Sequence, residues 1–286
     1  MNTNESKTDQ SAPRKRSFAL SPSRVKDFHQ CPLKFRLRVI DAIPEPPSLA
    51  ALKGTIVHSV LEHLYEAPAL QRSESYAQTL LEPLWAKHLE GSPEDLELFS
   101  STSELDQWLL SARDLIAAYF RLENPQYLEP IGREQFVSAQ LPSGLAIRGV
   151  IDRLDEAANG DLRVIDYKTG KSPSVRFQDE YLFQMKFYAA ALQYSQNRLP
   201  LRTQLLFLGD QRTLTYDPHP SDVDAVTNSL EHSWSEMKSR NETGEFEPKK
   251  GPLCPWCNFQ NLCPAFGGQP PEIPESGSEY LLTAQQ

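Results

Sequence analysis

The sequence has no long hydrophobic run and no apolar leader. No stretch approaches the roughly 18–20 apolar residues that a membrane-spanning helix requires. The polar N-terminus, MNTNESKTDQSAPRKRS, lacks the apolar core of a secretory signal. We therefore expect a cytoplasmic protein with no membrane partner. Hydrophobic residues make up 39% and charged residues 23% of the 286-residue chain, which is typical of a soluble globular protein with one sizeable core.

Two further absences limit architecture and function. The chain contains no G-x4-G-K-[ST] phosphate loop, so it carries no helicase-type nucleotide site of its own. It also has no internal repeat, which argues against a solenoid or an array. We expect a disordered polar tail at 1–17, a single folded domain at 18–266 and a flexible tail at 267–286.

The net charge of −9 would disfavour nucleic acid, but the charge is unevenly distributed. Residues 1–40 contain nine Lys and Arg against three Asp and Glu, which leaves −15 for the remaining residues. A local basic surface matters more for phosphate contact than the total charge does. The basic run at 14–16 could equally be part of a solvated tail.

The order of the predicted elements indicates an α/β or α+β core. Strands are expected at 136–137, 145–151, 162–165 and 204–208, with a further one at 213–216. Helices are expected after Pro22, from Gly54, through 70–125 with a break near 91–93, at 177–195 and at 221–240. The helical segment at 70–130 carries no recognisable motif, and we interpret it as an insertion or lid over the core.

Two aspartates lie on neighbouring predicted strands whose connection contains Asn159-Gly160. Asp166 and Lys168 point to the same face, because side chains alternate along a strand. A two-residue turn would set Asp152 opposite Tyr167 and send the aspartates to opposite faces. A three-residue loop or a bulge would set Asp152 opposite Asp166. We predict the second register, because a shared metal site requires it.

The residue types suit metal-dependent phosphoryl chemistry. Two carboxylates and the imidazole of His58 match the ligand preference of Mg²⁺ or Mn²⁺. A lysine two residues beyond a ligand carboxylate can position the attacking water or stabilise the charge that develops. Taken alone, Asp166 and Lys168 could form a solvent-facing ion pair, and His58 could be packed or exposed.

Four motifs taken together resemble the RecB-like branch of the PD-(D/E)XK nuclease superfamily. They are Gly54-x3-His58, Gly149-x2-Asp152-Arg153, Val164-Ile165-Asp166-Tyr167-Lys168-Thr169-Gly170 and Gln184-x3-Tyr188. They occur in the family's order, and the resemblance spans about residues 18–266. It implies a restriction-endonuclease-like core in which helices flank a central mixed sheet.

The resemblance also implies roles for individual residues. His58, Asp152 and Asp166 would be metal ligands, the carbonyl of Tyr167 a possible further ligand, and Lys168 the catalytic lysine. Gln184 and Tyr188 would face the site from the helix after the catalytic strand, since positions four apart share a helix face. Tyr188 could instead pack in the core. Glu134 is a further candidate, as a ligand or as a supporting acid.

The four cysteines form a single pattern. Cys31 stands alone, and Cys254-x2-Cys257-x5-Cys263 follows near the other end of the chain. The pattern resembles the iron–sulfur clasp of RecB-like nucleases such as the AddB subunit and the CRISPR-adaptation nucleases. That resemblance implies a structural 4Fe–4S cluster joining the N- and C-terminal segments. The alternatives are zinc, or four reduced cysteines packed as small apolar side chains.

Basic and aromatic residues around these motifs are candidates for nucleic-acid contact. The basic ones are Arg24, Lys26, Lys34, Arg36, Arg38, Arg153, Lys249 and Lys250. Trp256 and Phe259 could stack on unpaired bases or shield the cluster.

The sequence therefore predicts an Mg²⁺- or Mn²⁺-dependent deoxyribonuclease. The resemblance implies an exonuclease that acts on single-stranded DNA ends in repair or recombination, alone or with a separate helicase. The alternative is a non-catalytic DNA-binding or helicase-partner module that keeps the fold and the clasp as a scaffold.

Overall fold

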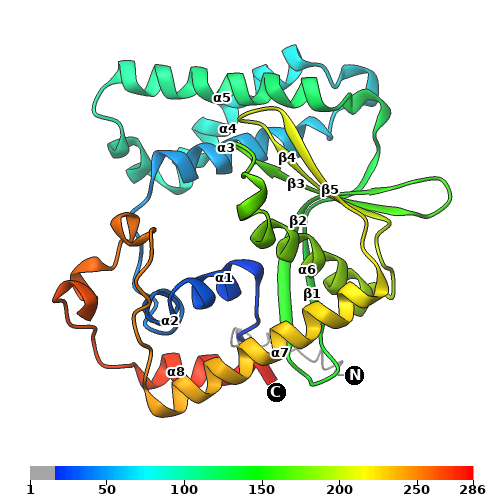
Figure 1. Ribbon diagram of the computed structural model, residues 1–286. Helices are drawn as coiled ribbons and strands as arrows, with labels where there is room; N and C mark the ends of the chain where they lie inside the picture. The colour runs from blue at the N-terminus through cyan, green and yellow to red at the C-terminus, as the bar shows by residue number, and fades with distance from the viewer. Residues whose placement is uncertain (1–16, 286) are drawn as a thin grey trace, which may run out of the picture.

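A five-stranded mixed sheet forms the centre of the computed structural model, which describes residues 17–285 (Figure 1). The strands lie in the order β1 (Pro130–Gln140), β2 (Ala146–Glu156), β3 (Leu162–Lys168), β4 (Arg202–Phe207) and β5 (Arg212–Tyr216). Strands β3 and β4 run parallel, and the other neighbours are antiparallel. The expected α/β core with a central mixed sheet is thus confirmed. The predicted tail falls almost wholly at 1–16, outside the described residues.

Helices cover both faces of the sheet (Figure 1). The longer ones are α1 (Pro22–Gln30), α3 (Leu49–Leu64), α4 (Glu74–Gly91), α5 (Thr102–Leu122), α6 (Asp179–Gln196), α7 (Pro220–Thr243) and α8 (Glu275–Leu282). The short α2 (Pro32–Phe35) continues into a π-helical turn, η1 (Arg36–Ile40). Short 3-10 turns are η2 (Ala69–Gln71), η3 (Pro93–Leu98), η4 (Pro125–Tyr127), η5 (Val175–Phe177), η6 (Cys254–Trp256), η7 (Gln260–Leu262), η8 (Pro264–Phe266) and η9 (Thr283–Gln285).

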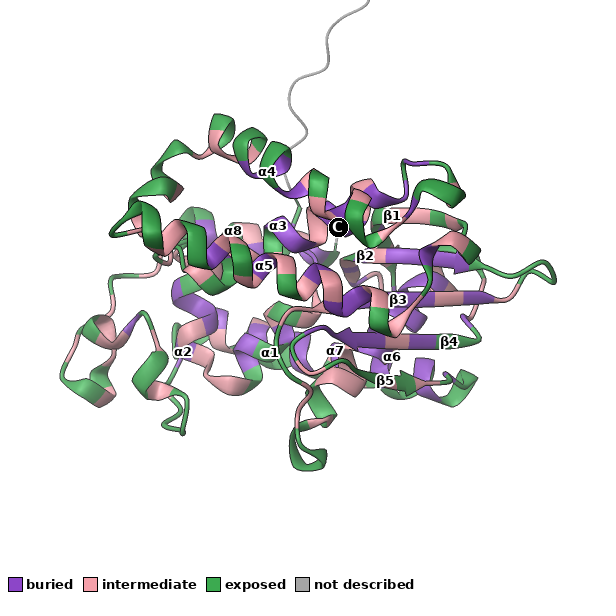
Figure 2. Ribbon diagram, turned by 90° about the horizontal axis from the view of Figure 1, so that it is seen from above, coloured by how far each residue is buried: buried purple, intermediate pink, exposed green. Residues whose placement is uncertain are grey.

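Two apolar clusters lie on the two faces of the sheet. One joins residues of β1, β2 and β3 to α1, α6 and α7. The other joins α3, α4 and α5 to residues of β3 and β4. Figure 2 shows the central strands β2, β3 and β4 largely buried between these layers, whereas the edge strand β5 is mostly exposed. The sheet is therefore held from both sides.

Serine residues mark where four of the helices begin. The side chains of Ser21, Ser48, Ser73 and Ser101 each accept a hydrogen bond from a backbone N–H in the first turn of the helix that follows. Such caps satisfy N–H groups that have no partner within the helix. The predicted start of the first helix, at Pro22 with a serine cap, is confirmed.

The β2–β3 hairpin adopts the predicted register. Its loop has three residues and ends in Gly160, whose φ of +88° is readily adopted by glycine. The last paired residues are Arg153 and Ile165. Continuing that register sets Asp152 opposite Asp166, at the point where pairing between the strands ends.

Beyond that point β2 has a different neighbour. Leu20 forms a parallel bridge with Ile147, and the N–H of Arg148 donates to the carbonyl of Leu20 at 2.8 Å. The N-terminal segment therefore occupies the edge of β2 that β3 has left. Asp152 and Asp166 therefore lie where β2 and β3 separate, between the pairing with β3 and the pairing with the N-terminal segment. We call this place the fork in the sheet.

The segment at 267–286, expected to be a flexible tail, is ordered where it is described. Helix α8 packs against α7 and η1, and Leu281 is fully buried. The ring of Tyr280 stands edge-on to Phe18 at 5.6 Å, and the N–H of Phe18 donates to Thr283 at 2.6 Å. The prediction was wrong because the apolar residues of this polar stretch match a surface formed by the distant N-terminal segment.

The helical segment at 70–130 is built into the second apolar cluster. Trp85 of α4 lies 5.2 Å from Trp108 of α5, and both pack with α3. Tyr119 of α5 stands edge-on to Tyr167 of β3 at 5.7 Å. The segment thus supports the central sheet as well as covering it. None of the helices within 17–285 is both long and apolar enough to cross a membrane.

Candidate active site

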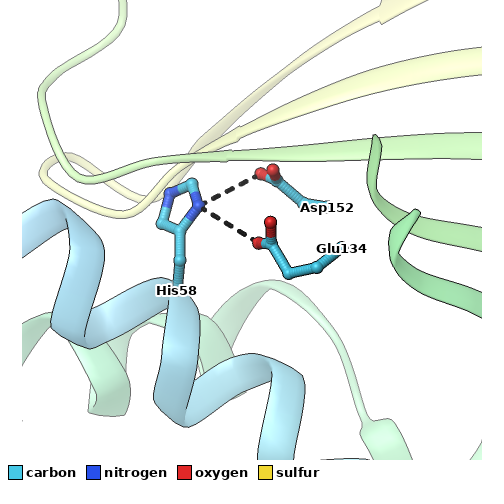
Figure 3. Close-up of side chains that lie close together, drawn as sticks. All are labelled: His58, Glu134 and Asp152. Carbon is cyan, nitrogen blue, oxygen red and sulfur yellow. Dashed lines mark ion pairs between the residues drawn. The ribbon is translucent and has the colours of Figure 1, made fainter. Parts of the chain in front are cut away.

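Three potential ligands converge from three elements at the fork in the sheet. His58 comes from α3, Glu134 from β1 and Asp152 from β2 (Figure 3). His58 Nδ1 lies 3.4 Å from Asp152 Oδ2 and 4.0 Å from Glu134 Oε1. One ligand atom of each residue lies within 4.8 Å of the other two. This spacing and donor set suit a single divalent cation.

Glu134 reaches this position through an unusual backbone conformation. Its neighbours Arg133 and Gln135 pair with Arg153 and Ile151, so Glu134 stands opposite Asp152. Its φ of +41° lies in the left-handed region, which non-glycine residues rarely adopt within a strand. Such strain persists where the surrounding structure imposes it, and it concentrates at functional sites. Glu134 therefore joins His58 and Asp152 as a principal candidate ligand.

Asp166 lies beside this group rather than within it. Its buried carboxylate forms a 2.6 Å ion pair with the Lys168 ammonium and accepts a 2.9 Å hydrogen bond from the Gln184 amide. The structure thus brings together His58 and Asp152 from the predicted ligand set, and it pairs Asp166 with the predicted catalytic lysine. A direct bond from Asp166 to the metal remains a prediction.

Burial and the negative charge of Asp152 raise the pKa values of Glu134 and Asp166. Burial raises the pKa of Glu134 to about 6, and the negative charge of Asp152 adds to the shift. Burial also raises the pKa of Asp166 to about 6, where Asp152 adds and Lys168 opposes. For His58, burial lowers the pKa, but hydrogen bonding and charge from Asp152 outweigh it and leave the pKa raised. Buried acids that disfavour one another's ionisation are stabilised by a cation, so the site fits a divalent ion.

Helix α6, which follows β3, contacts the site through Gln184. The Gln184 amide also donates to the hydroxyl of Tyr188 at 3.3 Å. Tyr188 is buried in the core, and a role for it at the site stays a prediction. A Cβ atom on Gly149 would stand 2.9 Å from the Tyr188 ring. The glycine of the Gly149-x2-Asp152 motif therefore leaves room for the tyrosine.

Tyr167 contacts the site through its backbone. Its N–H donates to Asp152 Oδ2 at 2.6 Å, which orients the carboxylate toward His58. Its ring points away, into the cluster formed by α3 and α5. The role of its carbonyl as a metal ligand stays a prediction.

Arg153, predicted to contact nucleic acid, is a core residue. Its side chain is only 1% exposed. The guanidinium forms ion pairs with Asp155 at 2.9 Å and Glu123 at 2.8 Å. It also donates to the hydroxyls of Tyr65 at 2.7 Å and Tyr167 at 2.8 Å. The prediction was wrong because these partners enclose the charge and leave it no access to a phosphate.

Two more of the predicted DNA-contacting residues are tied into the protein. Arg36 is buried, forms a 3.1 Å ion pair with Asp41 and donates to the carbonyl of Pro271, so a phosphate contact is excluded for it as well. Arg24 is half-buried, with its guanidinium 4.5 Å from the centre of the Phe18 ring. Arg24 thus holds the junction of the two chain ends.

The remaining basic candidates are accessible to solvent to different degrees. They pair as Lys26 with Glu180, Lys34 with Asp27, Arg38 with Asp27 and Glu45, Lys249 with the carbonyl of His29, and Lys250 over the ring of Phe266. The Lys26–Glu180 pair is exposed on both sides and worth little, so Lys26 can exchange its partner for another anion, whereas the buried carboxylate of Asp27 holds Lys34 and Arg38. Their contact with DNA stays a prediction.

All four cysteines line one cavity of about 280 Å³ between the two ends of the chain. They are unpaired thiols of intermediate exposure. The N–H of Lys249 donates to Cys31 Sγ at 3.4 Å, and the N–H of Gly251 donates to Cys254 Sγ at 3.3 Å. Such donors stabilise thiolate charge. The fold therefore unites the distant cysteine with the other three around one space.

The two aromatic residues of this region behave differently. Phe259 is buried and packs with Leu33, Leu37 and the partly buried cysteines, so it shields the sulfur atoms. Trp256 is 77% exposed and free to meet a ligand.

Comparison with known proteins identifies relatives over nearly the whole chain. Residues 19–264 match the family model of the PD-(D/E)XK nuclease superfamily. The Gene 69 proteins of Mycobacterium phages L5 and D29 are 26% identical over 291 residues and 23% identical over 269 residues. Each alignment covers 86% of this chain and 96% of the phage protein.

A crystal structure from Eubacterium rectale has a similar fold. It belongs to a protein given the provisional description of exonuclease, and it superposes with a TM-score of 0.55 at 16% sequence identity. The superposition covers 84% of this chain and 87% of that one. At this identity the likeness concerns the fold alone.

Proposed function

This chain belongs to the PD-(D/E)XK nuclease superfamily, and on that premise we propose that it is a metal-dependent deoxyribonuclease acting on single-stranded DNA from an end. The observation that carries the proposal is the meeting of His58, Glu134 and Asp152 beside the Asp166–Lys168 pair. A scaffold protein has no need for a strained acid, a buried acid and a partly buried lysine around one point.

The ligand set fits Mg²⁺ or Mn²⁺ held by Asp152, Glu134 and His58, with Asp166 adjacent. When bound there, such an ion would supply Lewis-acid polarisation of a phosphoryl oxygen and favour ionisation of water. The protein's part is to hold the carboxylates in place. The Tyr167 N–H orients Asp152, and the Gln184 amide orients Asp166.

Lys168 acts as a cation in this proposal. Burial lowers its pKa, but the charge of Asp166 outweighs burial and leaves the pKa raised. The side chain therefore stays protonated at neutral pH. It can orient a water by hydrogen bonding and stabilise negative charge that develops on the phosphate. This favours a positioning and charge-stabilising role over that of a general base.

The cysteine clasp is proposed to hold a 4Fe–4S cluster of structural role. Four thiolates on one zinc ion would stand about 3.8 Å apart, given a Zn–S distance of about 2.3 Å. Here, no three of the four sulfur atoms, all in the described part of the chain, lie within 4.8 Å of one another. That wider spacing and the cavity of about 280 Å³ support a larger group. Brown colour and visible absorption of anaerobically purified protein would distinguish it from colourless zinc.

The single-strand preference is supported by the exposed Trp256 and by Lys249 and Lys250 nearby. Aromatic side chains beside basic ones bind unpaired bases and backbone together. The chain would then work in the cytoplasm in repair or recombination, on ends that it meets alone or receives from a separate helicase.

End-labelled and circular single-stranded DNA, digested with Mn²⁺ and with excess chelator, test the proposal. We expect linear DNA to be degraded, circles to resist, and the chelator to stop the reaction. Asp166→Asn and Lys168→Ala should each lower the rate by at least about 100-fold while leaving DNA binding intact. Asp161→Asn, which changes a partly exposed acid at the end of the loop of the same hairpin, is the matched control. DNA binding by the wild type without cleavage under any divalent ion would instead favour the non-catalytic scaffold, and unchanged cleavage in the two variants would place the activity outside this site.

A further inference from the structure

An apolar pair lies exposed on the β1–β2 hairpin. Phe136 and Val150 face each other across the two strands, and they are 62% and 40% exposed. The next residues along each strand, Val137 and Ile151, are buried against α6. Since side chains alternate along a strand, the pair points to the opposite face, beyond the cover of α3. Single exposed apolar residues are ordinary, but two that pair across neighbouring strands form a small apolar surface that a ligand can cover.

The pair lies next to the candidate metal site. Phe136 follows Glu134 by two residues on β1, and Val150 precedes Asp152 by two residues on β2. Two residues of strand span about 7 Å. Arg148 stands two residues beyond Val150 along the same strand, partly exposed, with its guanidinium beside the hydroxyl of Tyr280. Along β2, whose course Figure 1 shows, a ligand would thus pass acidic, apolar and basic side chains in turn.

That succession matches an extended single strand of nucleic acid. With one phosphate at the metal site, the adjoining base reaches the apolar pair and the next phosphate approaches a guanidinium. Unpaired bases offer their faces to aromatic side chains, whereas bases inside a duplex are already stacked. The surface is also too small for a protein, because a stable interface buries about 800 Å² on each partner.

We propose that Phe136, backed by Val150, stacks on the unpaired base next to the scissile phosphodiester, and that Arg148 contacts the following phosphate. This inference rests on the proposed nuclease function and adds a residue that selects single strands. Phe136 positions the substrate and takes no part in the chemical step.

Phe136→Ala should lower kcat/KM for single-stranded DNA by about 5- to 150-fold, the range for loss of one stacked base. Phe136→Ala should raise KM more than it lowers kcat. Phe136→Trp should restore kcat/KM. Tyr127→Ala, which removes an 85% exposed aromatic residue far from the site, should cleave like the wild type. Because Phe136 is exposed, its truncation should leave the melting temperature unchanged, and this is checked for each variant.

A substrate with one abasic residue, moved along the oligonucleotide, provides the decisive comparison. In the wild type one position should be sensitive, and at that position the Phe136→Ala protein should show no further loss. If the wild type cleaves DNA but no position distinguishes the two proteins, the stacking inference is overturned and the nuclease proposal stands. If the wild type cleaves no nucleic acid with any divalent ion, the proposed function itself fails.

Discussion

Replacing Arg153 tests whether this residue contacts a phosphate, as its place in the motif suggests, or stabilises the core, as its surroundings in the structure indicate. The residue follows the motif aspartate, and its position in the sequence suggests a phosphate contact. In the structure its charge is enclosed by Asp155, Glu123 and three tyrosine hydroxyls. Arg153→Met keeps the length and apolar character of the stem and removes the guanidinium. We expect the variant to lose stability, with little direct effect on DNA affinity.

The expected loss of stability depends on the buried carboxylates that remain once the guanidinium is removed. Removing one partner of a buried ion pair typically costs about 3–5 kcal/mol, because the other charge stays buried without compensation. Asp155 and Glu123 both keep a contact with Arg163, at 2.7 and 3.2 Å. We therefore expect the lower end, about 3 kcal/mol. At about 2–4 °C per kcal/mol for large domains, the melting temperature should fall by about 6–12 °C.

Thermal and urea unfolding would be measured alongside single-strand affinity at several salt concentrations. Arg163→Ala is the matched control: it removes a half-exposed partner of the same acids and should cost about 1 kcal/mol or less. Adding Asp155→Asn to Arg153→Met should recover part of the loss, because it removes a carboxylate left uncompensated. An unchanged melting temperature together with weaker, less salt-dependent DNA binding would refute the assignment to the core.

Three other substitutions test neighbouring parts of the argument. Gln184→Ala removes the amide that donates to the buried carboxylate of Asp166 and should weaken Mn²⁺ binding by about 10- to 100-fold, measured by calorimetry. Unchanged Mn²⁺ affinity would show that Gln184 does not orient Asp166 for metal binding. Gly149→Ala places a methyl group 2.9 Å from the Tyr188 ring and should cost about 1–3 kcal/mol in urea unfolding, whereas a neutral result would mean that the ring has room to move. Leu281→Ala should lower the free energy of unfolding by about 2–5 kcal/mol, whereas Leu282→Ala, at an exposed position, should change it little. Equal and small effects of the two substitutions would mean that α8 does not pack against the folded domain.

Much of the site could be predicted from local patterns. The resemblance to the nuclease family singles out His58, Asp152, Asp166 and Lys168, which the structure brings close together, and the register of the acidic hairpin follows from the need for a shared site. Glu134 was only a secondary candidate, because its place opposite Asp152 depends on the pairing of β1 with β2. Its strained φ has no signal in the sequence.

Local spacing by itself determined most of the helices and strands and the order of the motifs, because periodicity, caps and turn residues act over a few positions; α8 was the exception. The tertiary structure alone decided which side chains are enclosed. Arg153 is buried because Tyr65 and Glu123 reach it from the ends of α3 and α5, and Phe136 is exposed because none of the elements within 17–285 covers its side chain. Burial depends on partners brought from distant parts of the chain, and a sequence pattern does not state which partners those will be.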